Sequence, residues 1–173
     1  RIDSLDYEEK FDDEIKIFKK LTNGKSKGFR APSFSLNDKS SWIIDVLEEN
    51  QYVYDSSVVP VKTSLYGIPN AESKPYKITS KNLKNNSKNG KILEFPLLVT
   101  KILGKTIPAA GGFYLRTLPT RVIENAIKSY EKRQIPGVFY IHSWELTPEF
   151  MPKNELTKKD HFITFHNINK AYS

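Results

Sequence analysis

The fold of this chain is decided by residues 28–57, whose sequence is GFRAPSFSLNDKSSWIIDVLEENQYVYDSS. Gly28 to Arg30 predict a short strand, because an aromatic residue here precedes a proline that cannot continue a sheet ladder. Asn37 or Asp38 is then placed to cap a helix. A second strand is expected at residues 52–54, where tyrosine and valine favour extended backbone.

Two helices are predicted by apolar side chains at helical spacing, one before the first strand and one between the strands. The earlier helix spans residues 4–21, with acidic residues early and lysines late, as the helix dipole prefers. Its apolar stripe is Tyr7, Phe11, Ile15 and Phe18, and the later stripe is Trp42, Ile43, Val46 and Leu47. Helices that alternate with short strands are typical of parallel β/α units. We therefore expect an α/β fold.

The rest of the chain departs from this order. Residues 58–110 are rich in proline and glycine, which predicts an irregular insertion with hairpinned strands near residues 92–105. A further helix is expected from Pro119, which suits the first helical position. We accordingly divide the chain into residues 1–57, 58–110 and 111–173.

A buried strand is predicted at residues 138–141, VFYI, because the run is short, apolar and rich in β-branched and aromatic residues. It would deliver His142, Trp144 and Glu145 to its carboxyl end, where function concentrates in α/β folds.

The composition of the chain excludes several kinds of functional site. The chain has 173 residues, no cysteine and a net charge of +7. Without cysteine there is no disulfide and no thiolate metal or nucleophile site. The apolar runs fall far short of the ~20 residues that span a bilayer, so we expect no membrane partner. Much of the positive excess lies between Lys74 and Lys91, and we favour a solvated loop there over a nucleic-acid site, because nucleic-acid readers interleave aromatic side chains with the charge.

Common catalytic motifs are missing from the sequence, which has neither G-x-S-x-G nor G-x-G-x-x-G. Gly24 to Ser26 imitates the end of a phosphate loop but lacks its first glycine. His161 and His166 are five residues apart, which places them on different faces of a helix or strand. We therefore predict no metal site within this chain.

Two short segments do carry chemistry. Residues 28–34, GFRAPSF, place Arg30 at a strand end before a rigid turn, where a guanidinium can hold a carboxylate with two hydrogen bonds. Residues 139–145, FYIHSWE, place His142 beside an indole. Taken alone, each segment is better explained by a structural role, but together they indicate a site.

Together these segments resemble the polysaccharide deacetylases with a NodB homology domain, carbohydrate esterase family 4. Residues 28–35, followed by a helix and YDSS at residues 54–57, are similar to the third and fourth motifs of that family. EFP at residues 94–96, AGGFYLRTLP at residues 110–119 and FYIHSWE at residues 139–145 resemble the C-terminal extension of one bacterial and archaeal branch. That branch is associated with exopolysaccharide and exosortase gene systems.

The resemblance implies part of a distorted, seven-stranded β/α barrel that hydrolyses N-acetyl groups on a glycan with a divalent metal, usually zinc. It implies that His142 is the general acid that protonates the leaving amine, that Arg30 orients the general base, and that Asp55 tunes the histidine. Substrate-binding residues in this interpretation are Trp144, Trp42 and Pro32.

The metal ligands of that family, one Asp and two His, and its general base, a second Asp, are supplied by an Asp-Asp pair and a His-x-x-x-His pair that have no counterpart in this sequence. Asp12 and Asp13 are no substitute, because they lie on the polar side of an amphipathic helix. We therefore expect a C-terminal portion of such a deacetylase, inactive and without a cofactor by itself, that works with a companion chain or as a homo-oligomer. The alternative is a non-catalytic module that binds glycan or nucleic acid. The compartment stays open, with the cytoplasm favoured.

Overall fold

The structure is a computed structural model that describes residues 8–63, 66–151 and 156–172. The chain forms two compact units, residues 1–97 and 98–173. The boundary between the units falls inside the segment expected as an insertion, residues 58–110. That segment therefore contributes strands to both units.

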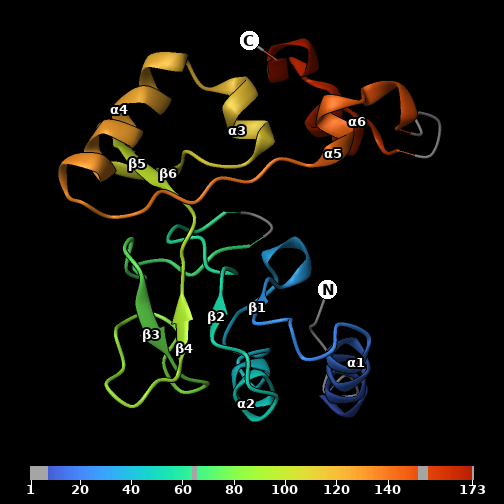
Figure 1. The fold of residues 1–173 in the computed structure, drawn as a ribbon. Helices are drawn as coiled ribbons and strands as arrows, with labels where there is room; N and C mark the ends of the chain where they lie inside the picture. Colours follow the sequence, from blue (N-terminus) through green and yellow to red (C-terminus); the bar gives the residue numbers. More distant parts are fainter. Residues whose placement is uncertain (1–7, 64–65, 152–155, 173) are drawn as a thin grey trace. The chain divides into compact units, whose positions relative to one another are not determined.

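The first unit is built on a four-stranded sheet with the strand order β1-β2-β4-β3 (Figure 1). Its strands are β1 (Gly28–Phe29), β2 (Tyr54–Asp55), β3 (Tyr76–Ile78) and β4 (Ile92–Glu94). β1, β2 and β4 run parallel, and β3 is antiparallel to β4. The predicted parallel β/α arrangement is thus confirmed for β1 and β2. In the register of β2 and β4, Asp55 lies directly opposite Glu94.

Both predicted helices of this unit are present. α1 spans Glu8–Leu21, and residues 4–7 of the prediction lie outside the described residues. α2 spans Ile43–Glu49, but the predicted cap is wrong, because Trp42 occupies the N-cap position without a side-chain hydrogen bond. The Asn37 side chain instead accepts a hydrogen bond from the Lys39 N–H in the preceding turn.

The second predicted strand begins later than expected, at Tyr54 rather than Tyr52. The Tyr52 N–H donates to the Leu47 carbonyl at 2.9 Å and so still belongs to the end of α2. The Tyr52 side chain is buried in the core, but its backbone is bonded to the helix, so its residue type predicted the strand two residues too early.

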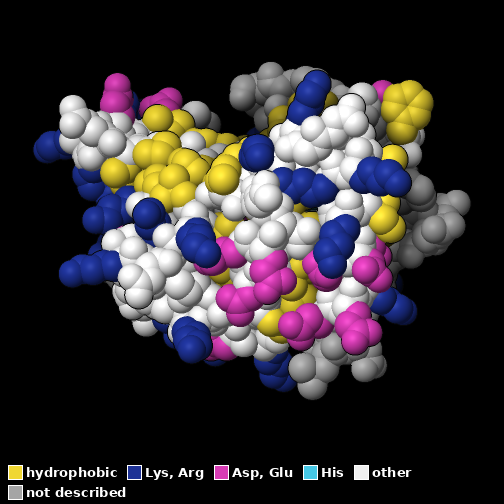
Figure 2. Space-filling view, turned by 60° about the horizontal axis from the view of Figure 1, so that its bottom comes forward, with side chains coloured by type: hydrophobic (Ala, Val, Ile, Leu, Met, Phe, Trp, Pro, Cys, Tyr) yellow, Lys and Arg dark blue, Asp and Glu magenta, His cyan; other side chains and the backbone are white. Residues whose placement is uncertain are grey.

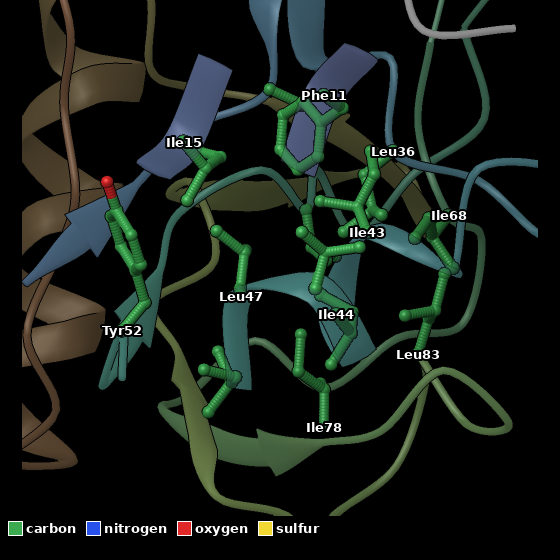
Figure 3. Packing of buried hydrophobic residues seen from close by; sticks show 14 of the residues in the cluster. Phe11, Ile15, Leu36, Ile43, Ile44, Leu47, Tyr52, Ile68, Ile78 and Leu83 are labelled. Atoms are coloured by element: carbon green, nitrogen blue, oxygen red, sulfur yellow. The ribbon is translucent and has the colours of Figure 1, made fainter. Parts of the chain in front are cut away.

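One apolar core joins the helices and the sheet of the first unit (Figure 3). Members from α1, α2, β3 and β4 include Phe11, Ile15, Ile43, Ile44, Leu47, Ile78 and Ile92. The predicted stripe of α2 is confirmed for Ile43, Val46 and Leu47, whereas Trp42 precedes the helix and is partly buried against the core. In the predicted stripe of α1, however, Phe18 is 52% exposed, so the buried face of that helix is shorter than its periodicity predicts.

The second unit pairs a two-stranded hairpin with short helices (Figure 1). Its elements are β5 (Val99–Ile102), β6 (Lys105–Pro108), α3 (Gly112–Thr117), α4 (Thr120–Lys132), α5 (Ser143–Leu146) and α6 (Lys158–Phe165). The predicted hairpin is confirmed, and its turn contains Gly104 at φ 77°. The helix expected from Pro119 is confirmed with one shift, since Pro119 is its N-cap rather than its first helical residue.

The prediction of a buried strand at residues 138–141 is wrong. The Val138 carbonyl accepts a hydrogen bond from the Leu98 N–H at 3.1 Å, but Phe139 and Ile141 are 37% and 50% exposed. The segment belongs to neither sheet. Its residue types favour extended backbone, but a strand also needs a neighbouring strand to pair with, and residue type does not predict that neighbour.

The α/β class is confirmed as a mixed α/β fold. Within the part of the chain that the structure describes, the two sheets are open and no barrel closes, so a seven-stranded barrel is not formed by these residues. None of the described helices is long and apolar enough to cross a membrane.

Candidate functional site

His142 begins the short helix α5 and lies at its N-cap position. Its side chain is 54% exposed, whereas the Glu145 side chain three residues later is buried. Glu145 Oε2 accepts a hydrogen bond from the His142 N–H at 2.8 Å, which satisfies a backbone donor that every helix start leaves free. The same oxygen lies 3.5 Å from His142 Nδ1. A buried carboxylate therefore stands beside a half-exposed imidazole.

Arg116 of α3 neutralises this buried carboxylate. Its Nη2 and Nε lie 2.9 and 3.1 Å from Glu145 Oε1, and both residues are almost fully buried. The guanidinium also donates to the carbonyls of Ile163 and His166, which lie at the end of α6. A buried ion pair is stable only when its remaining donors find partners, and these carbonyls meet that need.

Two adjacent glycines make room for this arrangement. A Cβ on Gly112 would come within 1.8 Å of Glu145 Oε1, so a side chain there and the carboxylate exclude each other. Gly111 has φ 96°, and a Cβ on it would meet the Tyr140 ring at 2.6 Å. The GGFYLR and FYIHSWE segments, which are far apart in sequence, thus pack directly against each other, Gly112 on Glu145 and Gly111 on Tyr140.

Aromatic rings flank the histidine. The Trp144 ring stacks on His142 with 5.4 Å between centroids and 22° between planes. The Tyr140 ring meets His142 edge-on at 5.3 Å. Beside this cluster lies a cavity of about 220 Å³ whose lining includes Gly112, Arg116, Ile141, Glu145 and Lys170. A mainly apolar cavity with a few charged groups, beside flat rings, is the usual setting for a small organic ligand.

In the first unit, Arg30 is held at the carboxyl ends of the strands. Its Nε and Nη2 each donate at 2.8 Å to Ser56, one to the carbonyl and one to the hydroxyl. The Ser56 hydroxyl in turn donates to the Phe95 carbonyl at 2.7 Å. The guanidinium also lies over the Phe34 ring, 5.6 Å from its centroid. Arg30 therefore has a defined place on an ordered loop.

Asp55 and Glu94 form a fully buried pair of carboxyl groups in the same unit. Burial raises the pKa of both, and the Asp55 charge raises the pKa of Glu94 further. Asp55 accepts hydrogen bonds from the Ser57 hydroxyl at 2.7 Å and the Ser57 N–H at 3.2 Å, which favour its charged form. Glu94 Oε1 accepts from the Val58 N–H at 3.0 Å, whereas no described donor reaches Oε2. Of the two carboxyl groups, Glu94 thus has the pKa raised by both burial and a neighbouring charge, which favours its protonated form beside Asp55.

The predicted substrate-binding residues of the first unit lie elsewhere in it. Trp42 packs against the apolar core and meets Phe11 edge-on at 5.6 Å. Pro32 begins the turn Pro32–Phe34, in which Ser33 and Phe34 both have positive φ. These contacts are structural, and the substrate-binding role of both residues stays a prediction.

The predicted site residues thus fall into two groups. Arg30 and Asp55 come together in the first unit through residues 56 and 57, whereas His142 and Trp144 come together in the second. Sequence reasoning gave no chemical role to Glu94, Arg116 or Glu145, although all three stand in the quoted motifs. A charged residue inside an otherwise apolar motif was the available signal.

No metal centre is formed by the residues described here: no three of their His, Asp or Glu side chains cluster as metal ligands. His161 and His166 instead pack on Phe165 and Phe162 of their own helix, with 4.8 and 4.6 Å between ring centroids.

The lysines between Lys74 and Lys91 are exposed, and backbone hydrogen bonds order the turns that carry them. Lys74 pairs with Glu72 at 3.6 Å, and Lys91 pairs with Glu48 at 3.5 Å. Tyr76, the aromatic residue within this segment, is buried and donates to the Leu83 carbonyl at 2.6 Å. Its ring is therefore not available to stack on a base. Figure 2 shows lysine and arginine side chains spread over the visible face rather than collected in one stripe.

Comparison with known proteins gives one result. No curated protein and no solved structure shows a significant match to this chain. Residues 56–173 match the family described as "Domain of unknown function (DUF3473)". The match begins directly after Asp55 and includes β3, β4 and the whole second unit. Because it covers more than half of the sequence, this chain belongs to the DUF3473 family.

Proposed function

We propose that this chain is the C-terminal portion of a metal-dependent polysaccharide deacetylase that hydrolyses N-acetyl groups on a glycan. The observation that carries the proposal is the meeting of its two most specific motifs. GGFYLR and FYIHSWE join at one buried ion pair, Arg116 with Glu145, which leaves His142 half-exposed between two aromatic rings. Both motifs lie within the family match.

The geometry suits the second half of amide hydrolysis. Cleavage of the C–N bond expels an amine, which must take up a proton as it leaves. An imidazole that is half-exposed and backed by a carboxylate can hold that proton and deliver it. The flat faces of Trp144 and Tyr140 suit the apolar face of a sugar ring beside this histidine.

The metal site is the part of the proposed enzyme that the described residues do not form. Since the described residues form no metal cluster, they do not fit a divalent ion, and no step of the reaction is assigned to such an ion here. In the proposal, the metal ligands and the general base belong to sequence encoded before Arg1. The 173-residue chain alone is then inactive.

The experiment compares this chain with the product of its whole reading frame. Both proteins are incubated with zinc and an N-acetylated oligosaccharide, and released acetate is measured. The proposal expects acetate from the longer protein and none from the 173-residue chain. Acetate release by the chain alone, or none by the longer protein on a panel of N-acetylated glycans, would contradict it.

The alternative of a non-catalytic binding module has one observation in its favour, the rings of Tyr140, His142 and Trp144 on the second unit. These rings favour glycan over nucleic acid, because the lysine-rich segment has no exposed aromatic partner among the described residues. The alternative predicts glycan binding by this chain, with no acetate released by the longer protein.

A further inference from the structure

The Glu145 carboxylate has more contacts than capping a helix requires. Its two oxygens divide between two partners: Oε1 faces the Arg116 guanidinium, and Oε2 faces the N–H and the ring of His142. An ordinary helix start needs only one acceptor atom from a residue at this position, so glutamine serves there as well as glutamate.

The surroundings of Glu145 accept a carboxylate and reject an amide. Both of its oxygens meet donors, whereas the amide of a glutamine has one oxygen and one NH₂ group. In either orientation the NH₂ group would face Arg116 or the His142 N–H, donor against donor. Gly112 removes the side chain that would otherwise occupy the space of this carboxylate. The pocket is therefore built for a negative charge next to His142.

The rings on either side limit how His142 can turn. Trp144 stacks on one face of the imidazole, and Tyr140 meets the ring edge-on. Nδ1 lies 3.5 Å from the buried Glu145 carboxylate, while the side chain as a whole is 54% exposed. Since Nδ1 is the ring nitrogen next to this carboxylate, Nε2 is the one left to meet a ligand.

From this geometry we infer that Glu145, held by Arg116, is a positioning residue that keeps the proton of His142 on Nδ1 and leaves Nε2 as the atom that exchanges a proton with substrate. The inference rests on the proposed function for its chemical role. In that role the C–N bond breaks, its electron pair stays on the amine nitrogen, and this nitrogen takes the proton from Nε2. The ring returns to its neutral form with Nδ1–H facing Glu145.

The first test uses the 173-residue chain and does not depend on activity. The sequence has three histidines, so ¹⁵N NMR can resolve each ring, and His142→Ala identifies the signals of His142. In the neutral ring we expect a protonated, pyrrole-type Nδ1 and an unprotonated, pyridine-type Nε2. A neutral ring with its proton on Nε2 overturns the inference, and this holds for the wild-type chain whether or not any variant folds.

The second test compares two glutamates. Glu145→Gln should shift the tautomer balance of His142, and Glu149→Gln, which changes an exposed glutamate four residues later, should leave it unchanged. In the longer protein, Glu145→Gln should lower kcat about 10- to 100-fold with little change in KM, as loss of an outer partner of a reacting group typically does. Unaltered kcat in a folded Glu145→Gln variant overturns the inference.

The two proposals fail separately. If the longer protein releases no acetate but His142 carries its proton on Nδ1, the positioning by Glu145 stands and the deacetylase assignment falls. If acetate is released but the neutral ring carries its proton on Nε2, the assignment stands and the positioning falls.

Discussion

The two units solve the problem of a buried carboxylate in opposite ways. In the first unit, Asp55 and Glu94 are like charges side by side in the sheet, and they remain buried because one of them keeps a proton. In the second unit, Glu145 is buried against the opposite charge of Arg116. The stability of the Asp55–Glu94 pair should therefore depend on pH. The stability of the Arg116–Glu145 pair should depend on whether every charged group and donor has its partner.

The units also differ in what surrounds these groups. The buried apolar cluster around the sheet draws its members from the first unit, so the carboxyl pair there is one feature of a larger core. The second unit combines short helices with one hairpin, and its ion pair joins α3, α5 and the end of α6. Loss of one charged group should therefore disturb the second unit more than the first.

The largest effect is expected for Arg116→Leu. This change leaves Glu145 buried without its counter-charge and should lower the free energy of unfolding of the second unit by about 3–5 kcal/mol. Arg121→Leu removes an exposed arginine of α4 and should change stability by less than about 0.5 kcal/mol. Urea unfolding of each variant measures the difference. Equal stability of Arg116→Leu and wild type would show that the pair contributes nothing.

Gly112→Ala should follow, at about 1–3 kcal/mol, because its Cβ would overlap Glu145 Oε1 and force the carboxylate away from His142. Gly24→Ala is the matched control, since a Cβ there meets no atom within 4 Å and its cost comes from the positive φ of 72°. Thermal unfolding compares the two variants. If Gly112→Ala is no more harmful than Gly24→Ala, the close approach to Glu145 is not required.

Glu94→Gln should alter the pH dependence of the first unit. The pKa of Glu94 is raised in the folded state, so its contribution to stability is fully present at acidic pH and is lost as the pH rises through the raised pKa. A glutamine can donate to Asp55 and accept from the Val58 N–H at every pH. The variant should therefore keep stability at alkaline pH that wild type loses, by about 1–3 kcal/mol, the usual penalty for an unsatisfied buried group.

The measurement for this pair is urea unfolding across a pH series, followed by amide exchange within β2 and β4. Glu49→Gln, which changes an exposed glutamate of α2, is the control and should retain the wild-type pH profile. If the stability of Glu94→Gln and of wild type changes with pH in the same way, protonation of Glu94 does not contribute to the stability of the first unit.

The smallest effects come from two buried tyrosines, one in each unit. Tyr76 donates to the Leu83 carbonyl at 2.6 Å, whereas the Tyr130 hydroxyl accepts from the Val99 N–H at 3.3 Å. Replacement by phenylalanine should destabilise each unit by about 0.5–1.5 kcal/mol, with the larger loss at Tyr76, where the bond is shorter. Thermal unfolding ranks the two variants, and a larger loss at Tyr130 would reverse the expectation.

The sequence predicted what depends on local periodicity. α1, α2 and α4 are found where apolar spacing placed them, and the hairpin β5–β6 lies close to its predicted position. The errors arose where tertiary contacts outweigh residue type. Tyr52 resembles a strand residue but ends α2, and residues 138–141 resemble a strand but have no sheet to join.

The candidate site was predictable only in its motifs. His142 and Arg30 were proposed from residue type and position, and their roles stay predictions, whereas the buried pairs of charged groups in their units were not predicted. Arg116 and Glu145 are 29 residues apart, and Glu94 stands opposite Asp55 only because β2 and β4 are neighbours in the sheet. Periodicity reports which face of an element is buried and cannot report which charged groups meet there.

The central claim is that His142 gives the proton to the leaving amine, and acetate release by the longer protein tests it most directly. His142→Ala should lower kcat by about 10²–10⁴ while the zinc content stays at the wild-type value. His161→Ala, which changes an exposed histidine of α6 that packs on Phe165, should retain wild-type turnover. Full turnover by the His142→Ala protein, with its zinc in place, would contradict the account.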